Sequence, residues 1–181
     1  DNPEKLWALH ITPDILPMLG VQPVLGRVFL PEEGDTGKEH EVILSYRLWQ
    51  SHFAGDKEII GRSVALSGET YPVVGVIPRE FQFAPFWATK AEIWAPLALG
   101  DRVGSRGGNS LRVFARLSPR VTLEKARAEM TAITARLDTA LHGATRNVLV
   151  LSLRAKHVGH LLPVRVVLPV AVGFVFFGGF A

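Results

Sequence analysis

The C-terminal end of the sequence restricts most strongly what the chain can fold into. Residues 166–181 contain no charged side chain, and residues 161–181 form one apolar stretch that only Arg165 interrupts. A helix that spans a bilayer needs about 20 apolar residues. A segment of a soluble core normally shows polar residues at helical or alternating spacing, and none follow Arg165. We therefore expect a transmembrane helix to start here.

Two prolines keep a second interpretation of this stretch open. Pro163 and Pro169 weaken the helical interpretation, although membrane helices tolerate proline better than soluble helices do. The alternative is a buried C-terminal helix or strand.

The remaining composition is typical of a globular protein. The 181 residues are 48% hydrophobic and 20% charged, with 10 Phe and 4 Trp, which argues against intrinsic disorder. The length suits one compact domain, or two small lobes. The absence of cysteine excludes disulfide scaffolds, thiolate metal clusters and cysteine nucleophiles.

Charge is divided unevenly along the chain. Residues 1–100 carry 8 basic and 13 acidic side chains, whereas residues 101–181 carry 12 basic and 4 acidic ones. A basic half invites a nucleic-acid interpretation. However, the arginines are scattered over a strand and a helix, with no nucleic-acid-binding motif beside them, so nucleic acid is not an expected partner.

Local patterns predict alternating strands and helices. Thr12, Ser45 and Thr122 are expected to cap helices, and the last helix ends near Gly143. Its buried face is expected to be an apolar stripe of Leu123, Ala126, Met130, Ile133, Leu137 and Leu141. Strands are expected at residues 6–11, 42–44, 63–66, 70–77, 93–97, 110–117 and 148–153, with a hairpin turn at residues 67–69. This order predicts an α+β fold, a mixed sheet with helices packed on one face.

A search for catalytic or metal-binding motifs is negative. Ser45 lies where a nucleophile would sit between strand and helix, but the glycines of a nucleophile elbow are absent, so a helix cap explains it better. His157 and His160 lack a third ligand nearby in the sequence. One loop carries five carboxylates, Glu32, Glu33, Asp35, Glu39 and Glu41. We expect no hydrophobic pocket around them that would raise the pKa of any of these side chains. We therefore predict that the chain is not an enzyme and has no catalytic, cofactor-binding or metal site. The side chains of the aromatic segment 81–87 are expected to pack against other apolar groups.

Several segments, in order, resemble one family. They are residues 19–33 (LGVQPVLGRVFLPEE), 44–50 (LSYRLWQ), 53–56 (FAGD), 60–62 (IGR), 68–78 (GETYPVVGVIP), 93–97 (IWAPL), 115–117 (ARL) and 121–126 (VTLEKA). Together they are similar to the MacB-like periplasmic core domain of FtsX/MacB-type ABC transporter permeases. The chain departs from the family at Arg120, where glycine is usual.

The resemblance implies an extracytoplasmic domain over residues 1–156, N-terminally incomplete. A juxtamembrane segment and partial transmembrane helix are then expected over residues 157–181. The implied function is non-catalytic: the domain would couple cytoplasmic ATP hydrolysis to movement of a periplasmic substrate or partner. Its implied location is the bacterial inner membrane, facing the periplasm.

The resemblance also implies partners. These are the membrane, a cytoplasmic ABC ATPase and, in addition, a periplasmic protein, with a homodimer or pseudo-dimer in the full-length permease. Two other functions stay open on the residues alone. One is a soluble extracytoplasmic ligand-binding module, and the other is a hydrolase that uses Ser45 and a histidine.

Overall fold

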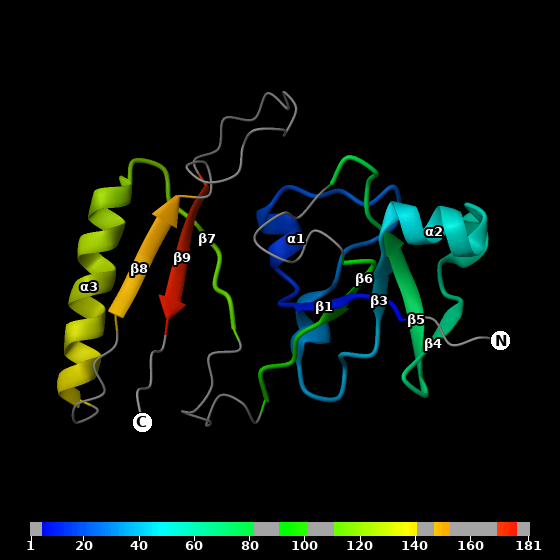
Figure 1. Ribbon diagram of the computed structural model, residues 1–181, viewed down its shortest axis with the longest axis horizontal. Coiled ribbons are helices and arrows are strands. Elements are labelled where there is room, and N and C mark those ends of the chain that lie inside the picture. Colours follow the sequence, from blue (N-terminus) through cyan, green and yellow to red (C-terminus); the bar gives the residue numbers. More distant parts are fainter. Residues whose placement is uncertain (1–4, 82–90, 101–110, 141–146, 153–169, 177–181) are drawn as a thin grey trace. The chain divides into compact units, whose positions relative to one another are not determined.

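The computed structural model describes residues 5–81, 91–100, 111–140, 147–152 and 170–176. The chain folds into two compact units, residues 1–104 and residues 105–181 (Figure 1). The boundary expected between residues 156 and 157 lies outside the described residues and stays a prediction.

The first unit contains a six-stranded mixed sheet. Its strands are β1 (Ala8–Ile11), β2 (Leu25–Gly26), β3 (Val42–Leu44), β4 (Ser63–Leu66), β5 (Glu69–Val76) and β6 (Ile93–Pro96). They lie in the order β1-β6-β3-β5-β2, and β4 pairs with β5. The pairs β1–β6 and β3–β5 are parallel, whereas the others are antiparallel. The predicted α+β fold with a mixed sheet is confirmed.

The predicted hairpin is formed by β4 and β5. Ser63 pairs with Pro72 and Leu66 with Glu69, so the turn consists of two residues, Ser67 and Gly68. Both have positive φ, 52° and 90°. This is the backbone conformation that suits the right-handed twist of two antiparallel strands.

Helix α2 (Tyr46–Phe53) begins where the sequence predicts. The Leu48 N–H donates to Ser45 Oγ at 3.1 Å, which makes Ser45 the N-cap. The helix ends when Ala54 takes a left-handed conformation, with φ 50°. Local capping chemistry therefore fixes both ends of this helix.

Helix α1 (Ile15–Met18) begins later than predicted. Its N-cap is Asp14, not Thr12, and no side chain caps it. Asp14 already has helical dihedral angles, and the Ile15 N–H donates to the backbone carbonyl of Thr12 at 3.1 Å. Gly20, with φ 74°, follows the helix as the expected stop.

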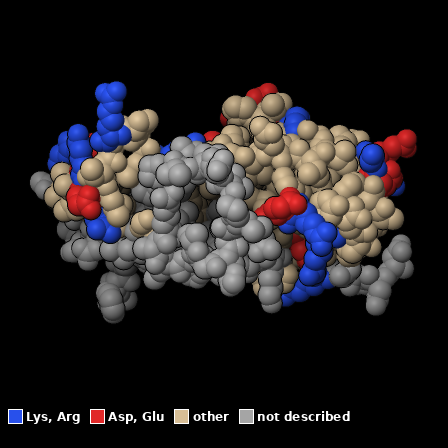
Figure 2. Space-filling view, turned by 90° about the horizontal axis from the view of Figure 1, so that it is seen from above, with Lys and Arg blue, Asp and Glu red and all other residues tan. Residues whose placement is uncertain are grey.

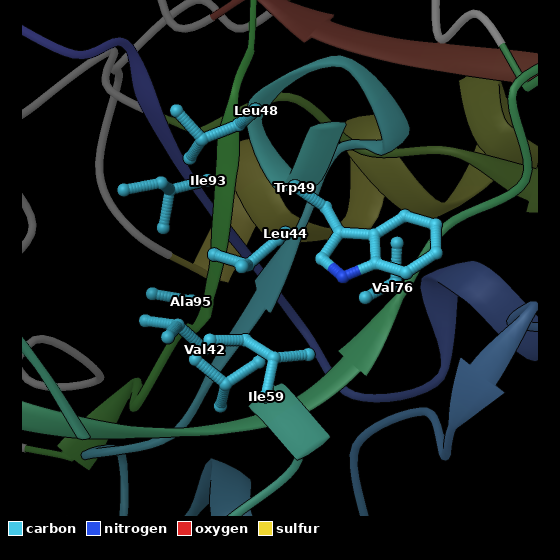
Figure 3. Packing of buried hydrophobic residues seen from close by; sticks show 9 residues of the cluster. Val42, Leu44, Leu48, Trp49, Ile59, Val76, Ile93 and Ala95 are labelled. Carbon is cyan, nitrogen blue, oxygen red and sulfur yellow. The ribbon is translucent and has the colours of Figure 1, made fainter. Parts of the chain in front are cut away.

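The core of the first unit lies between α2 and one face of the sheet (Figure 3). Leu48 and Trp49 of α2 pack there together with side chains from β3, β5, β6 and the 3-10 turn η2 (Lys57–Ile59), which are Val42, Leu44, Ile59, Val73, Val76, Ile93 and Ala95. The Trp49 Nε1–H donates to the Asp56 carbonyl at 2.8 Å, so the indole is buried without losing its hydrogen bond.

The second unit contains helix α3 (Leu123–Ala140) and three antiparallel strands, β7 (Ala115–Arg116), β8 (Asn147–Ser152) and β9 (Val170–Phe176). Their order is β7-β9-β8, and α3 packs on β8. The Lys125 N–H donates to Thr122 Oγ1 at 3.2 Å, which confirms Thr122 as the cap. The expected stop at Gly143 lies outside the described residues.

Two expectations for this unit are wrong. Among the described residues of the predicted strand 110–117, only residues 115–116 form a strand, and Leu111 and Val113 are 43% and 46% exposed. The α3 stripe was expected to bury Leu137, which is 46% exposed, whereas Thr134 is 8% exposed. The Thr134 hydroxyl donates to the Met130 carbonyl at 2.8 Å, and this bond allows a polar side chain to take the buried position.

The C-terminal stretch also differs from the expected helix where it is described. Residues 170–176 form β9, which pairs with β7 and β8. Valine and phenylalanine dominate this segment, and both favour strands. None of the helices in the described ranges is long and apolar enough to cross a membrane. Residues 161–169 and 177–181 lie outside the described residues.

Candidate functional site

Two facing glycines bring the short strand β2 against β5. Gly26 is opposite Gly75 in the antiparallel register, and a Cβ on either residue would collide with the backbone of the other strand, at Val74 or Arg27. The Arg27 N–H then donates to the Val74 carbonyl at 2.9 Å. The glycine pair therefore fixes the point at which Arg27 leaves the sheet.

Arg27 forms an ion pair with Glu33 in the first unit. Glu33 belongs to the 3-10 turn η1 (Pro31–Gly34) and is 5% exposed. The guanidinium donates two hydrogen bonds to the carboxylate, at 3.0 and 2.5 Å, and the Leu30 N–H donates a third at 2.9 Å. The hydrogen bond to Glu33 raises the pKa of Arg27. The buried carboxylate is thus fully charge-paired and anchors the loop.

Glu41 enters β3 beside this pair. Its Oε2 atom is buried and has no hydrogen-bond partner. Burial raises the pKa of Glu41, and the neighbouring Glu33 raises it further, whereas Arg27 lowers it. The expectation that the loop carboxylates lie in surroundings that raise no pKa is therefore wrong for Glu41.

Three polar side chains, His40, Tyr71 and Glu69, lie where the loop before β3 meets the hairpin of β4 and β5. The rings of His40 and Tyr71 stack with their centroids 5.6 Å apart. The Tyr71 hydroxyl donates to Glu69 Oε2 at 2.8 Å, and this bond raises the pKa of Tyr71. Val42 is opposite Val73 in the parallel register, and His40 and Tyr71 each lie two residues before one of these valines.

The candidate residues of the sequence analysis have different fates. Ser45 is occupied as a helix cap, which the sequence favours over a nucleophile. His157 and His160 lie outside the described residues. Of the aromatic segment, Phe81 is described, and its ring lies 5.8 Å from that of Trp94, which is 3% exposed. Phe81 therefore packs against the sheet.

The described arrangement holds a loop in place. Within the described ranges, no group of three His, Asp or Glu side chains is placed to hold a metal ion. The Arg27 guanidinium is occupied by Glu33, so its geometry provides a clamp between η1 and β2. Charged side chains elsewhere follow the sequence pattern: on the face seen in Figure 2, Lys and Arg predominate at the end that holds α3.

Sequence reasoning missed the Arg27–Glu33 pair and the facing glycines. The six-residue separation of Arg27 and Glu33 gives no helical or strand periodicity, because the chain turns between them. The available signal was Phe29, an apolar residue within a polar loop, which is 3% exposed. A buried aromatic between two opposite charges indicates that the loop folds back onto the sheet.

A comparison with protein-family models identifies one family. The model of the MacB-like periplasmic core domain matches residues 2–133. Among solved structures, the periplasmic region of MacB from Actinobacillus actinomycetemcomitans is similar, with 15% sequence identity and a TM-score of 0.49. That match covers 75% of this chain and 57% of the MacB chain. No curated protein matches the sequence.

Proposed function

Because the chain belongs to the family of MacB-like periplasmic core domains, we propose that it is the non-catalytic extracytoplasmic domain of an ABC-type transporter permease. It couples ATP hydrolysis in the cytoplasm to movement of a periplasmic substrate or partner protein. The observation that carries this proposal is the family match over residues 2–133, which includes every described element of the first unit.

The internal contacts of the first unit support a mechanical role. A coupling domain has to move as a body, so its loops need anchors. The Arg27–Glu33 clamp holds η1 to the sheet, and the Arg47–Glu92 pair, at 3.0 Å, joins α2 to the residue before β6. Side chains that a hydrolase would leave free for substrate, such as the Ser45 hydroxyl, serve the fold instead.

The proposed organisation places residues 1–156 outside the cytoplasm. In this organisation residues 157–181 form the juxtamembrane segment and the start of a membrane span, which is an alternative to the pairing of residues 170–176 as β9. The proposed partners are the membrane, a cytoplasmic ABC ATPase and a periplasmic protein, with a dimer or pseudo-dimer of permeases. The charge-free run of residues 166–181 supports the membrane location.

A labelling experiment tests the location. The chain has no cysteine, so Lys57→Cys, at an exposed position, introduces one defined thiol. In intact cells of an organism that carries the protein in its membrane, a membrane-impermeant maleimide should label this thiol. The matched control is Val73→Cys. Because Val73 is 0% exposed, the thiol at this position should react only after denaturation. Labelling of Lys57→Cys only after cell lysis would place the domain on the cytoplasmic side.

A second experiment tests the coupling to ATP hydrolysis. Membrane preparations purified through a tag on the protein should hydrolyse ATP, because the proposed ATPase is a separate subunit or domain. The 181-residue chain alone should neither bind nor hydrolyse ATP, since its sequence contains no phosphate-binding loop. Saturable ATP binding by the isolated chain in calorimetry, or inactive membrane preparations, would contradict the proposal.

A further inference from the structure

The connection from β2 to β3, residues 27–41, is longer than the sheet order requires. Strand β5 alone separates β2 from β3. Strands β1, β6 and β2 run in one direction and β3 runs in the other, so β3 begins at the end of the sheet where those three strands finish. Neighbouring strands lie about 5 Å apart, so a few extended residues would be enough to connect β2 to β3.

The extra length carries the connection past β3 to the far strands of the sheet. Gly34 in η1 packs on Pro13, which follows β1, and a Cβ on Gly34 would lie 3.1 Å from the proline ring. Thr36 packs on Gly100, which follows β6, and a Cβ on Gly100 would collide with Thr36 Oγ1. Residues 27–41 therefore form a strap, which crosses this end of the sheet from β2 to β1 and then returns to β3.

Side chains fasten the first half of the strap. Phe29 is 3% exposed, and the buried Glu33 carboxylate binds both the Arg27 guanidinium and the Leu30 N–H. The paired residues of β1, β6 and β3 all lie outside the strap. The strap can therefore lift while these pairings persist, provided that the contact between Arg27 and Glu33 breaks.

We propose that the strap opens as one unit while the sheet stays folded, and that the Arg27–Glu33 pair is the catch that keeps it closed. Opening exposes the last hydrogen bond between β1 and β6, from the Leu97 N–H to the Ile11 carbonyl, and it releases Gly100. The chain runs on from Gly100 to the second unit at residues 105–181, so the strap sets how firmly the first unit holds the start of that connection. This device belongs to the fold of the first unit, and it operates whether or not the chain serves an ATPase.

Amide hydrogen exchange of the full chain at low urea concentrations tests this opening. The Leu30 N–H lies in the strap, and the Leu97 N–H lies at the end of the sheet that the strap crosses. We expect these two amides to share one opening free energy and one dependence on urea. The reference is the Ile77 N–H, which donates to the Leu44 carbonyl at 2.9 Å, at the opposite end of the sheet. It should exchange about tenfold more slowly, because only unfolding of the sheet exposes it.

A reversible crosslink locks the strap. A Cβ on Gly100 would lie 3.3 Å from the Thr36 Cβ, close to the separation of about 3.5–4.5 Å found in disulfides. In this cysteine-free chain, Thr36→Cys combined with Gly100→Cys should form a disulfide. The disulfide should bring the exchange rate of Leu97 down to that of Ile77. The same variant with its disulfide reduced is the matched control, and its Leu97 should again exchange faster than Ile77.

The catch is tested by Glu33→Gln, with Asp35→Asn as the control at the surface of the strap. Glu33→Gln should speed the exchange of Leu97 about tenfold, and Asp35→Asn should leave it nearly unchanged. Faster exchange at Ile77 with no change at Leu97 would show that the pair is not the catch.

Three results would overturn the opening itself. They are equal exchange rates for Leu97 and Ile77 in the wild type, different urea dependences for Leu30 and Leu97, and a double cysteine variant that forms no disulfide or leaves Leu97 unchanged. None of these measurements involves a membrane or ATP. A failure of this proposal is therefore distinct from a failure of the proposed function.

Discussion

The guanidinium of Arg27 and the carboxylate of Glu33 meet through two parallel hydrogen bonds, at 3.0 and 2.5 Å, although the chain reverses direction between them. Glu33 is almost completely buried in this pair, while the Arg27 side chain remains 41% exposed. The planar fork of arginine matches a carboxylate in a way that lysine cannot. The pair therefore closes the loop that connects β2 to β3.

Removing the buried charge should destabilise the first unit. We expect Glu33→Gln to lower the free energy of unfolding by about 1–3 kcal/mol, because the Arg27 guanidinium and the Leu30 N–H lose a charged acceptor. Urea denaturation followed by Trp fluorescence measures this loss. Asp35→Asn is the control, since Asp35 pairs with Lys38 at the surface and should cost less than about 1 kcal/mol. Equal losses for the two variants would show that the buried pair is no anchor.

Features that depend on neighbouring residues could be predicted from the sequence. The caps Ser45 and Thr122 use N–H groups three residues away, and the hairpin turn at Ser67 and Gly68 joins adjacent strands. Each cap and the turn depend on hydrogen bonds and dihedral angles within a few residues. The residue types in that short segment are therefore enough to predict them. The family resemblance rests on the same kind of short segments.

Features that depend on distant residues could not be predicted in the same way. The parallel pairing of Ala8 with Ile93 joins the start of the first unit to its end, and no local pattern specifies it. The close approach of Gly26 to Gly75 likewise depends on the pairing of β2 with β5, two strands that are far apart in the sequence. The cap predicted at Thr12 failed for a local reason: the Ile15 N–H donates to the Thr12 backbone carbonyl, and Asp14 already has helical dihedral angles.

Arg120 offers a direct test of backbone strain. It has φ 72°, a left-handed conformation that costs a non-glycine residue about 1–2 kcal/mol. This conformation accounts for the glycine that the resemblance implies at this position. Arg120→Gly should therefore raise the free energy of unfolding of the second unit by about 1 kcal/mol, after the greater entropy of glycine in the unfolded chain is counted.

Denaturation curves of Arg120→Gly and Arg120→Ala separate backbone strain from the loss of the charged side chain. Alanine keeps the Cβ atom that causes the strain, so Arg120→Ala should lie within about 0.5 kcal/mol of the wild type. A gain of the same size for alanine would assign the effect to the removed charge instead.

The two arginines of α3 should differ in their contribution to stability. Arg127 and Arg136 are both exposed, but the Arg127 Nε–H donates to the Val150 carbonyl in β8 at 3.0 Å. Arg127→Ala should therefore cost about 1 kcal/mol, whereas Arg136→Ala should stay within about 0.5 kcal/mol. Ile133→Ala serves as the reference for packing; because Ile133 is half-buried, about 1–2 kcal/mol is expected. A loss at Arg136 as large as that at Arg127 would mean that α3 uses a different face.

Deleting residues 161–181 tests what the C-terminal stretch does. We expect the full chain to be found with membranes and the shortened chain in the soluble fraction, because the deletion removes the charge-free run. The first unit should keep its fold, since all described strands of its sheet come from residues 8–96. Its melting midpoint, followed through the buried Trp49, is the measurement for this part.

The second unit distinguishes the two interpretations of the stretch. If residues 170–176 act only as the central strand β9, the deletion leaves β7 and β8 without their shared neighbour. The α3 amides would then lose their protection against hydrogen exchange, because α3 packs on β8. That loss, in a chain that is soluble before and after the deletion, would assign the stretch to the folded core and contradict the membrane anchor. Retained α3 protection together with release from the membrane would support the anchor.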